Sequence, residues 1–91
     1  MSVKTRKQCP LVMIEWVDSV QPKPTWEFLE DVRKPRAVHC VSVGWLVSDG
    51  KKTKSLAPNM GAISGSDDVQ VSGLITIPAC SVTRMRRLKE P

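Results

Sequence analysis

The stretch VHCVSVGWLVSDGKKTKSL, residues 38–56, decides the fold. Its first ten residues alternate between two faces that are both largely apolar, with Gly44 in the middle. This pattern predicts a central β-strand, and a glycine inside a strand usually marks a bulge or a tight bend. Asp49-Gly50 then separates two β runs, which favours a type I′ turn because both central residues of that turn need a positive φ. We therefore predict a hairpin whose second strand is KTKSLA, residues 52–57.

Segments on either side of this hairpin also have strand patterns. Residues 10–19, PLVMIEWVDS, alternate and predict the first strand. The loop PNMGAISGSDD, residues 58–68, is followed by VQVSGLITIP, residues 69–78, which predicts one more strand. The last strand is expected in ACSVTRMRRL, residues 79–88, after a short turn at Pro78.

The segment TWEFLEDV, residues 25–32, predicts one to two turns of helix. It follows two prolines, and Thr25 is a plausible N-cap for the first turn. In such a helix Trp26, Leu29 and Phe28 would pack inward, and the acidic side chains would face water.

Five strands with a brief turn between the last two, in a chain of 91 residues, indicate a mainly β fold. We expect a small five-stranded SH3-like or Sm-like half-open barrel with one short helix, because closing the sheet protects its edges. An open sheet packed under the helix is the competing architecture. The expected organisation is a basic N-terminal arm, residues 1–10, and a single small β-barrel domain, residues 11–91.

Composition indicates the cellular compartment in which the protein is expected to act. The sequence has no apolar run long enough to span a membrane and no signal-peptide pattern, so we expect a cytoplasmic protein without a membrane partner. The three cysteines are an odd number at wide spacing, which favours reduced thiols over a disulfide framework.

Several short motifs resemble an uncharacterised group of short bacteriophage and prophage proteins, which share an E-W-x-D-S start, a W-x-x-L segment, a C-x-S-V-G-[WF] strand and an I-P near the C-terminus. The matching residues here are Glu15, Trp16, Asp18, Ser19, Trp26, Leu29, Cys40, Ser42, Val43, Gly44, Trp45, Ile77 and Pro78. The resemblance implies a phage or prophage source, and hence a host cytoplasm, and a compact β-rich fold. It implies no activity.

The residue types that carry catalysis are poorly represented. The single histidine, His39, and its neighbour Cys40 alternate on a strand, so they point to opposite faces and cannot form a dyad. No C-x-x-C pair, second histidine or phosphate-binding G-K-[ST] loop is present. The sequence therefore predicts no enzyme, no catalytic residue, no metal site and no cofactor.

Positive charge is a stronger indication of function than any catalytic motif, because the chain has a formal net charge of +5. We single out the hairpin lysines Lys51, Lys52 and Lys54 as partner-binding residues, together with Arg84 and Arg86, which alternate on the last strand and so share a face. Whether these groups converge, or only keep the domain soluble, is left open by the pattern.

The tryptophans offer a second kind of contact. Trp26 follows two prolines and is the best candidate for a partly exposed interface anchor, whereas Trp16 and Trp45 lie on apolar strand faces and are expected in the core.

Three functions remain. The first is a phage-encoded, non-enzymatic protein that docks on a host protein and modulates or inhibits it, as a counter-defence or host-takeover factor. The alternatives are a small-barrel nucleic-acid-binding protein and a sponge that sequesters an anionic nucleotide signal.

Overall fold

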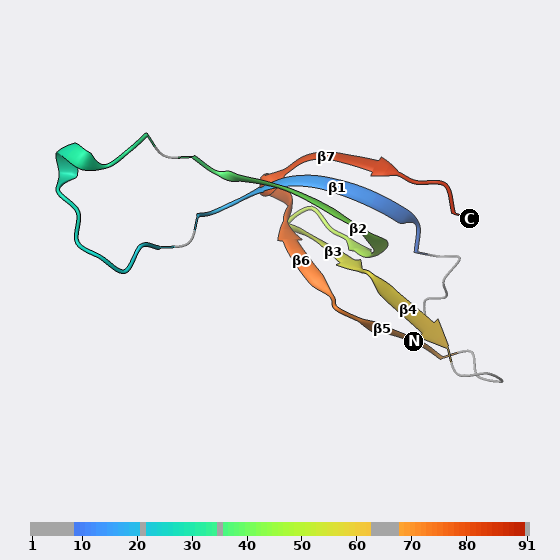
Figure 1. Cartoon of the computed structure of the whole chain (residues 1–91). Helices are drawn as coiled ribbons and strands as arrows, with labels where there is room; N and C mark the ends of the chain where they lie inside the picture. Colours follow the sequence, from blue (N-terminus) through green and yellow to red (C-terminus); the bar gives the residue numbers. More distant parts are fainter. Residues whose placement is uncertain (1–8, 21, 35, 63–67, 91) are drawn as a thin grey trace.

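A computed structural model of the chain describes residues 9–20, 22–34, 36–62 and 68–90, and it is mainly β as predicted. The larger sheet is antiparallel and five-stranded, in the order β6-β3-β2-β1-β7, and β4 and β5 form a second, two-stranded sheet (Figure 1). The strands are β1 (Leu11–Asp18), β2 (Val38–Asp49), β3 (Thr53–Ala57), β4 (Asn59–Ala62), β5 (Val69–Ser72), β6 (Ile75–Pro78) and β7 (Val82–Arg87). Two short 3-10 turns are η2 (Leu29–Asp31) and η3 (Ala79–Ser81). Most of the expected N-terminal arm, residues 1–8, lies outside the described residues.

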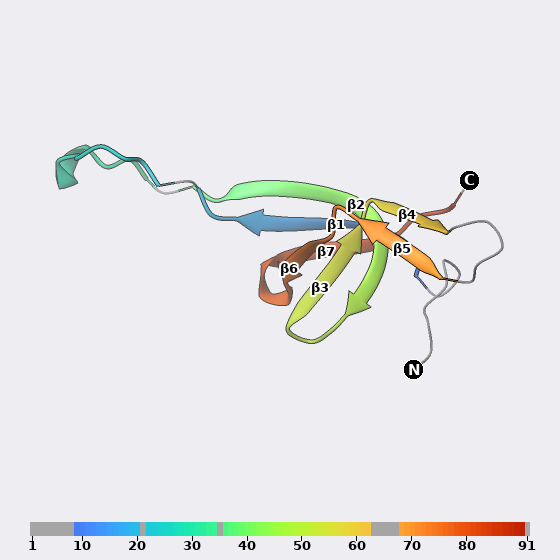
Figure 2. The same cartoon turned by 90° about the horizontal axis from the view of Figure 1, so that it is seen from below.

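The predicted central strand is confirmed, because β2 lies between β1 and β3. It pairs with β1 from Leu11↔Trp45 to Asp18↔Val38, and its register with β3 shifts between Leu46 and Ser48. The sheet curves strongly, so β6 and β7 approach each other around one side of it (Figures 1 and 2). η3 joins these two strands, which matches the short turn expected near Pro78.

A small apolar core fills the concave side of the sheet. Its buried members are Val12, Ile14, Leu46, Leu56 and Ile77, with Trp16, Ile75 and Val82 packed against them. Two side-chain hydrogen bonds connect neighbouring strands beside the core: the Trp16 Nε1–H donates to Ser42 Oγ (3.0 Å), and the hydroxyls of Ser55 and Thr76 lie 3.0 Å apart. The core position expected for Trp16 is therefore confirmed.

Gly44 allows β2 and β3 to approach closely. A Cβ atom at this position would lie 2.8 Å from the carbonyl oxygen of Ala57 and 3.0 Å from its carbonyl carbon, both backbone atoms that cannot rotate away. The bend predicted at Gly44 thus has a packing reason: only glycine lets the backbone of Ala57, itself fully buried, pass over the strand.

Four local predictions are wrong. The hairpin turn is not type I′, because Gly73 is the only described residue with positive φ; instead Gly50–Lys52 form a wider turn, closed by the Gly50 N–H donating to Thr53 O. The predicted loop after Ala57 contains β4, and the single strand predicted for residues 69–78 breaks at Gly73 (φ 75°) into β5 and β6. Trp45 lies on the convex side of β2, half-buried, where its Nε1–H donates to Glu90 Oε1 (3.2 Å).

The predicted helix over residues 25–32 is also wrong. Only η2 is helical, and its N-cap residue is Phe28, whose side chain makes no capping hydrogen bond, so the N-cap assigned to Thr25 is wrong too. A helix this short is marginal in water unless one face is buried, and this segment has no core to pack against.

The close approach at Gly44 makes a specific stability prediction. We expect Gly44→Ala to lower the free energy of unfolding by about 1–3 kcal/mol, because the new methyl group meets fixed backbone atoms. Gly61→Ala is the matched control, since a Cβ there meets nothing within 4 Å, and it should change stability by less than about 0.5 kcal/mol. Urea denaturation followed by far-ultraviolet circular dichroism measures both. Equal stability of the two variants would contradict the packing argument.

Candidate binding surfaces

The most prominent feature of the surface is a long projection, the β1–β2 loop, formed by residues 19–37. It continues the direction of β1 and β2 and extends well beyond the sheet (Figures 1 and 2). The molecule is accordingly elongated, with dimensions of 62 × 27 × 25 Å. Side chains at the end of the loop are thus far from the core, and a partner can reach them from several sides.

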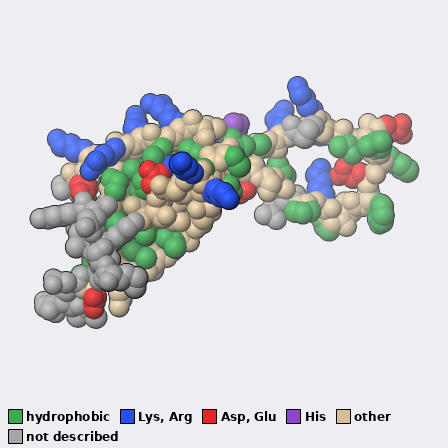
Figure 3. Space-filling view, turned by 180° about the vertical axis from the view of Figure 1, so that it is seen from behind, with side chains coloured by type: hydrophobic (Ala, Val, Ile, Leu, Met, Phe, Trp, Pro, Cys, Tyr) green, Lys and Arg blue, Asp and Glu red, His purple; other side chains and the backbone are tan. Residues whose placement is uncertain are grey.

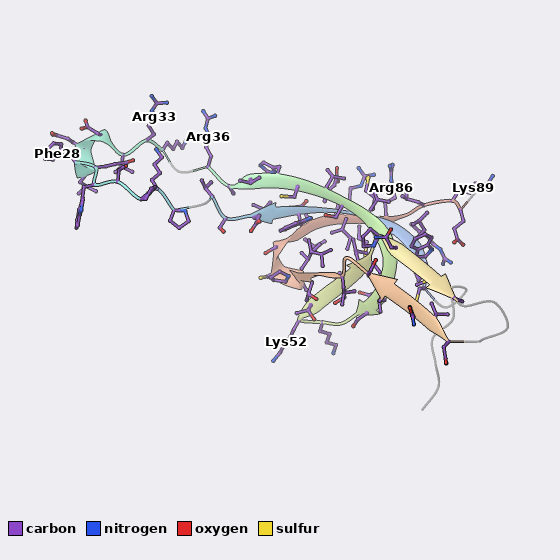
Figure 4. All side chains as sticks on the ribbon, turned by 60° about the horizontal axis from the view of Figure 1, so that its bottom comes forward. Phe28, Arg33, Arg36, Lys52, Arg86 and Lys89 are labelled. Carbon is purple, nitrogen blue, oxygen red and sulfur yellow. The ribbon has the colours of Figure 1, made fainter. Side chains whose placement is uncertain are left out.

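The end of this loop carries an exposed apolar group, which we call the tip cluster: Trp26, Phe28 and Leu29. Trp26 is fully exposed, Leu29 is 89% exposed and Phe28 is 77% exposed. Phe28 lies at the outermost part of the loop (Figure 4). The inward packing predicted for these three side chains is wrong, whereas the exposure of Trp26 predicted for an interface anchor is confirmed.

Acidic side chains surround the tip cluster. Glu27 Oε1 lies 3.4 Å from Lys23 Nζ, an exposed pair. Glu30 and Asp31 lie within η2, and neither forms an ion pair in the part of the chain that the structure describes. The end of the loop is therefore apolar and negative, although the whole chain is positive.

A cleft of about 710 Å³ lies between the two limbs of the loop. Its lining residues are Val20, Lys23, Thr25, Glu27, Val32, Arg33, Lys34 and Arg36. All of them are exposed, so this cleft supplies cationic groups but no buried polar side chain that would fix the orientation of a small ligand.

The hairpin lysines do not form one uniform group. Lys51 and Lys52 are exposed in the turn between β2 and β3. Lys54 forms an ion pair with Asp49, and its side chain is only 18% exposed. Two of the three predicted contact residues are therefore available to a partner, while the charge of Lys54 is largely compensated within the hairpin.

Arg84 and Arg86 do share a face, as predicted. In the β1–β7 register they lie beside Glu15 and Met13, on the convex side of the sheet, while Arg87 lies beside the buried Val12. Figure 4 shows Arg33, Arg36, Arg86 and Lys89 on the same side of the molecule and Lys52 on the opposite side. The predicted partner-binding residues thus divide among three places: the loop tip, the β2–β3 turn and the convex side of the sheet.

The sequence pattern missed the orientation of β2. Val41 (62% exposed) and Val43 (50% exposed) are on the convex side with His39, and the opposite side presents Ser42 and Gly44 to the interior. Both faces of β2 consist largely of apolar residues, so hydrophobicity alone could not show which face is buried. Gly44 was the signal in the sequence that could have indicated the inner face, because a glycine inside a strand often marks a close approach of another backbone.

The residue types able to bind metal are dispersed. Cys9 is buried, Cys40 is half-buried and Cys80 is exposed, and all three are free thiols. Within residues 9–20, 22–34, 36–62 and 68–90, no three His, Cys, Asp or Glu side chains gather into a metal site. The same part of the chain contains no helix with the length and apolarity that crossing a membrane requires.

Comparisons with known proteins add no assignment: no family model matches the sequence, and no curated protein or solved structure matches it. The function must therefore follow from the surfaces described above.

The exposure of Trp26 can be tested by fluorescence. We expect Trp26→Phe to remove most of the emission that acrylamide quenches readily, because Trp16 and Trp45 are half-buried and hydrogen-bonded. The free energy of unfolding should change by less than about 0.5 kcal/mol, since the ring makes no core contact. Quenching that is unchanged in the variant would contradict this placement of Trp26.

Proposed function

We propose that this protein is a non-enzymatic binding module that docks on a partner protein through the tip cluster of its β1–β2 loop. In the setting that the sequence resemblance implies, the module is phage-encoded and acts in the host cytoplasm, and the partner is a host protein that it modulates or inhibits.

The observation that carries this proposal is the exposure of three large apolar side chains at the end of a projection. Scattered exposed apolar residues are normal on protein surfaces, but Trp26, Phe28 and Leu29 lie within four consecutive positions and contact no core residue. Tryptophan is the residue most enriched in interface hot spots. Buried aromatic side chains contribute about 150–250 Å² each, so the tip cluster can supply roughly half of the ~800 Å² that one side of a standard interface buries.

The chemistry of the tip defines the partner surface that fits it. An apolar pocket would take Trp26 and Leu29, and basic side chains at its rim would pair with Glu30 and Asp31. Burying those carboxylates against an uncharged surface would be costly, because a buried charge requires a partner. We therefore propose a partner with an apolar pocket that is bordered by lysine or arginine.

The proposed scaffold for this loop is a small half-open barrel of the SH3-like or Sm-like kind. Support comes from the strong curvature of the five-stranded sheet and from the short η3 turn between β6 and β7. In such a scaffold the core is independent of the β1–β2 loop, so the loop can diversify without loss of the fold.

The tip fits protein docking better than nucleotide sequestration. A sponge for an anionic nucleotide would use the cleft between the loop limbs, where Lys23, Arg33, Lys34 and Arg36 supply positive charge. That cleft is lined only by exposed side chains, whereas high-affinity small-molecule sites bury most of the ligand.

The proposal is tested by identifying the partner and then measuring binary binding. The tagged protein is used to capture partners from nuclease-treated host lysate, and the captured protein is purified and titrated against the wild type. We expect Trp26→Ala to weaken binding roughly 30-fold or more, which corresponds to a hot spot of about 2 kcal/mol. Leu29→Ala should act in the same direction.

The matched comparison is Lys51→Glu with Lys52→Glu, which alters a different exposed site. Under the proposal this double variant binds the purified partner within about threefold of the wild type. Binding that depends on the hairpin lysines and not on Trp26 would contradict docking through the tip. Full retention of affinity in Trp26→Ala combined with Leu29→Ala would also contradict it.

A further inference from the structure

We propose that the convex side of the sheet, together with the adjoining limb of the β1–β2 loop, binds the phosphate backbone of duplex DNA. This basic face consists of Arg33 and Arg36 on the loop, Arg84 and Arg86 on β7, and Lys89. The inference is independent of the tip cluster, since Phe28 lies beyond Arg33 at the end of the loop (Figure 4).

The orientation of the side chains is the first argument. Arg33, Arg36, Arg86 and Lys89 project from the same side of the molecule, and the register places Arg84 on the same face of β7 as Arg86 (Figure 4). In a view from behind, Lys and Arg side chains stand along the upper edge of both the loop and the sheet, with the histidine between them (Figure 3). Groups that are far apart in the sequence thus form one positive edge.

These cations are available. Within the described residues the ion pairs are Lys23–Glu27 and Lys54–Asp49, and neither involves the basic face. Two carboxylates lie nearby: Glu15 beside Arg84, and Glu90, which accepts the indole N–H of Trp45. Five cations less these two carboxylates leave the face itself at +3, while Glu30 and Asp31, three and two residues before Arg33, belong to the tip of the loop. All five basic side chains belong to exposed residues.

The spacing fits an extended polyanion. The Leu88 N–H donates to Leu11 O, and Leu11 pairs with Trp45, so Lys89 lies near one end of the β1–β2 pairing, while Arg36 lies two residues before Val38 at its other end. The seven residue steps from Val38 to Trp45, at about 3.3 Å each, make this part of the basic face roughly 23 Å long, and Arg33 lies farther out on the loop (Figure 4). Duplex DNA presents a phosphate charge about every 1.7 Å along its axis, so a face of this length can contact several phosphates at once.

The aromatic residues decide between duplex and single-stranded nucleic acid. Proteins that bind single strands usually combine a basic groove with exposed rings on which bases stack. Here the indole of Trp16 faces the core and bonds to Ser42, and that of Trp45 is half-buried and bonds to Glu90. The exposed rings of Trp26 and Phe28 belong to the tip cluster, beyond Arg33, and not to the basic face (Figure 4). A face with unpaired arginines and no fully exposed indole suits backbone contacts, which are independent of sequence.

The test is a fluorescence-anisotropy titration of the full chain with a mixed-sequence DNA duplex of about 30 base pairs, at salt concentrations from about 50 to 200 mM. Each neutralised phosphate contributes about −0.9 to the slope of log affinity against log salt, so five contacts predict a slope of about −4. Binding should therefore weaken roughly 100-fold or more across this range.

The sequence offers a matched control for the charge change. Arg84→Glu with Arg86→Glu and Lys51→Glu with Lys52→Glu each alter the net charge by −4, from +5 to +1. The first pair should weaken binding at least about tenfold at low salt and reduce the magnitude of the slope by about 2. The second pair, in the turn on the opposite side, should leave the slope unchanged and the affinity within about threefold.

Arg33→Glu with Arg36→Glu is a second variant at two exposed loop residues outside the core cluster, so it tests the face with little risk to folding. It should weaken binding in the same direction as the β7 variant. Absence of duplex binding at low salt, equal losses for the two matched pairs, or tighter binding of a single strand or of poly-glutamate than of the duplex would each overturn the proposal.

Discussion

The structure depends on one contact between strands: the passage of the β3 backbone over Gly44 of β2. A Cβ on Gly44 would lie 2.8 Å from the carbonyl oxygen of Ala57, so this crossing exists only because the side chain is absent. The crossing lets the sheet bend, and the bend brings Leu56 of β3 and Ile77 of β6 over Ile14 of β1, where all three are buried. In a chain this small, which buries a modest fraction of its surface, the few fully buried side chains provide most of the stability.

The same contact determines which face of β2 is exposed. With Gly44 turned inward, Ser42 and Leu46 follow it by alternation, and Val41, Val43 and Trp45 are on the convex side. The pairing of β1 with β7 then places Arg84 and Arg86 on the same convex side, beside Glu15 and Met13, which pair in turn with Val41 and Val43. The position of the two β7 arginines in the basic face is therefore a geometric consequence of the way the core is packed.

The sequence predicted the strands better than it predicted the connections. Alternation from Leu11 to Asp18 and from Val38 onward indicated β1 and β2 because each strand buries one face in its middle, at Val12 and Ile14 in β1 and at Gly44 and Leu46 in β2. The type I′ turn predicted at Gly50 was wrong because Asp-Gly indicates only a local preference. The wider turn through Lys51 and Lys52 follows from how β3 meets β6. At Gly73 the break between β5 and β6 depends on a positive φ and on contact with Pro58, a residue far away in the sequence.

The binding surfaces were harder to predict for a related reason. Trp26 and the two arginines of β7 were identified as binding residues from their residue types. The helix predicted for TWEFLEDV, by contrast, assumed that Trp26 and Leu29 would face a core. Periodicity describes how side chains are arranged about an axis, and it carries no information on whether anything lies opposite them. Here nothing does, so the expected helix gives way to an extended loop with a single 3-10 turn.

The composition of the β1–β2 loop offers a reason why such a projection is compatible with a small domain. Ordering a residue costs roughly 1–2 kcal/mol of conformational entropy, and the side chains that the structure describes in this loop, at residues 19–20, 22–34 and 36–37, are all exposed. Three prolines at positions 22, 24 and 35 restrict its unfolded ensemble, which lowers the entropy lost when the loop is held extended. The same restriction lowers the cost of immobilising the tip cluster on a partner, because a segment that is already stiff has less freedom to lose. Prolines that remove hydrogen-bond donors and restrict the backbone therefore serve a segment whose contacts are made outside its own chain.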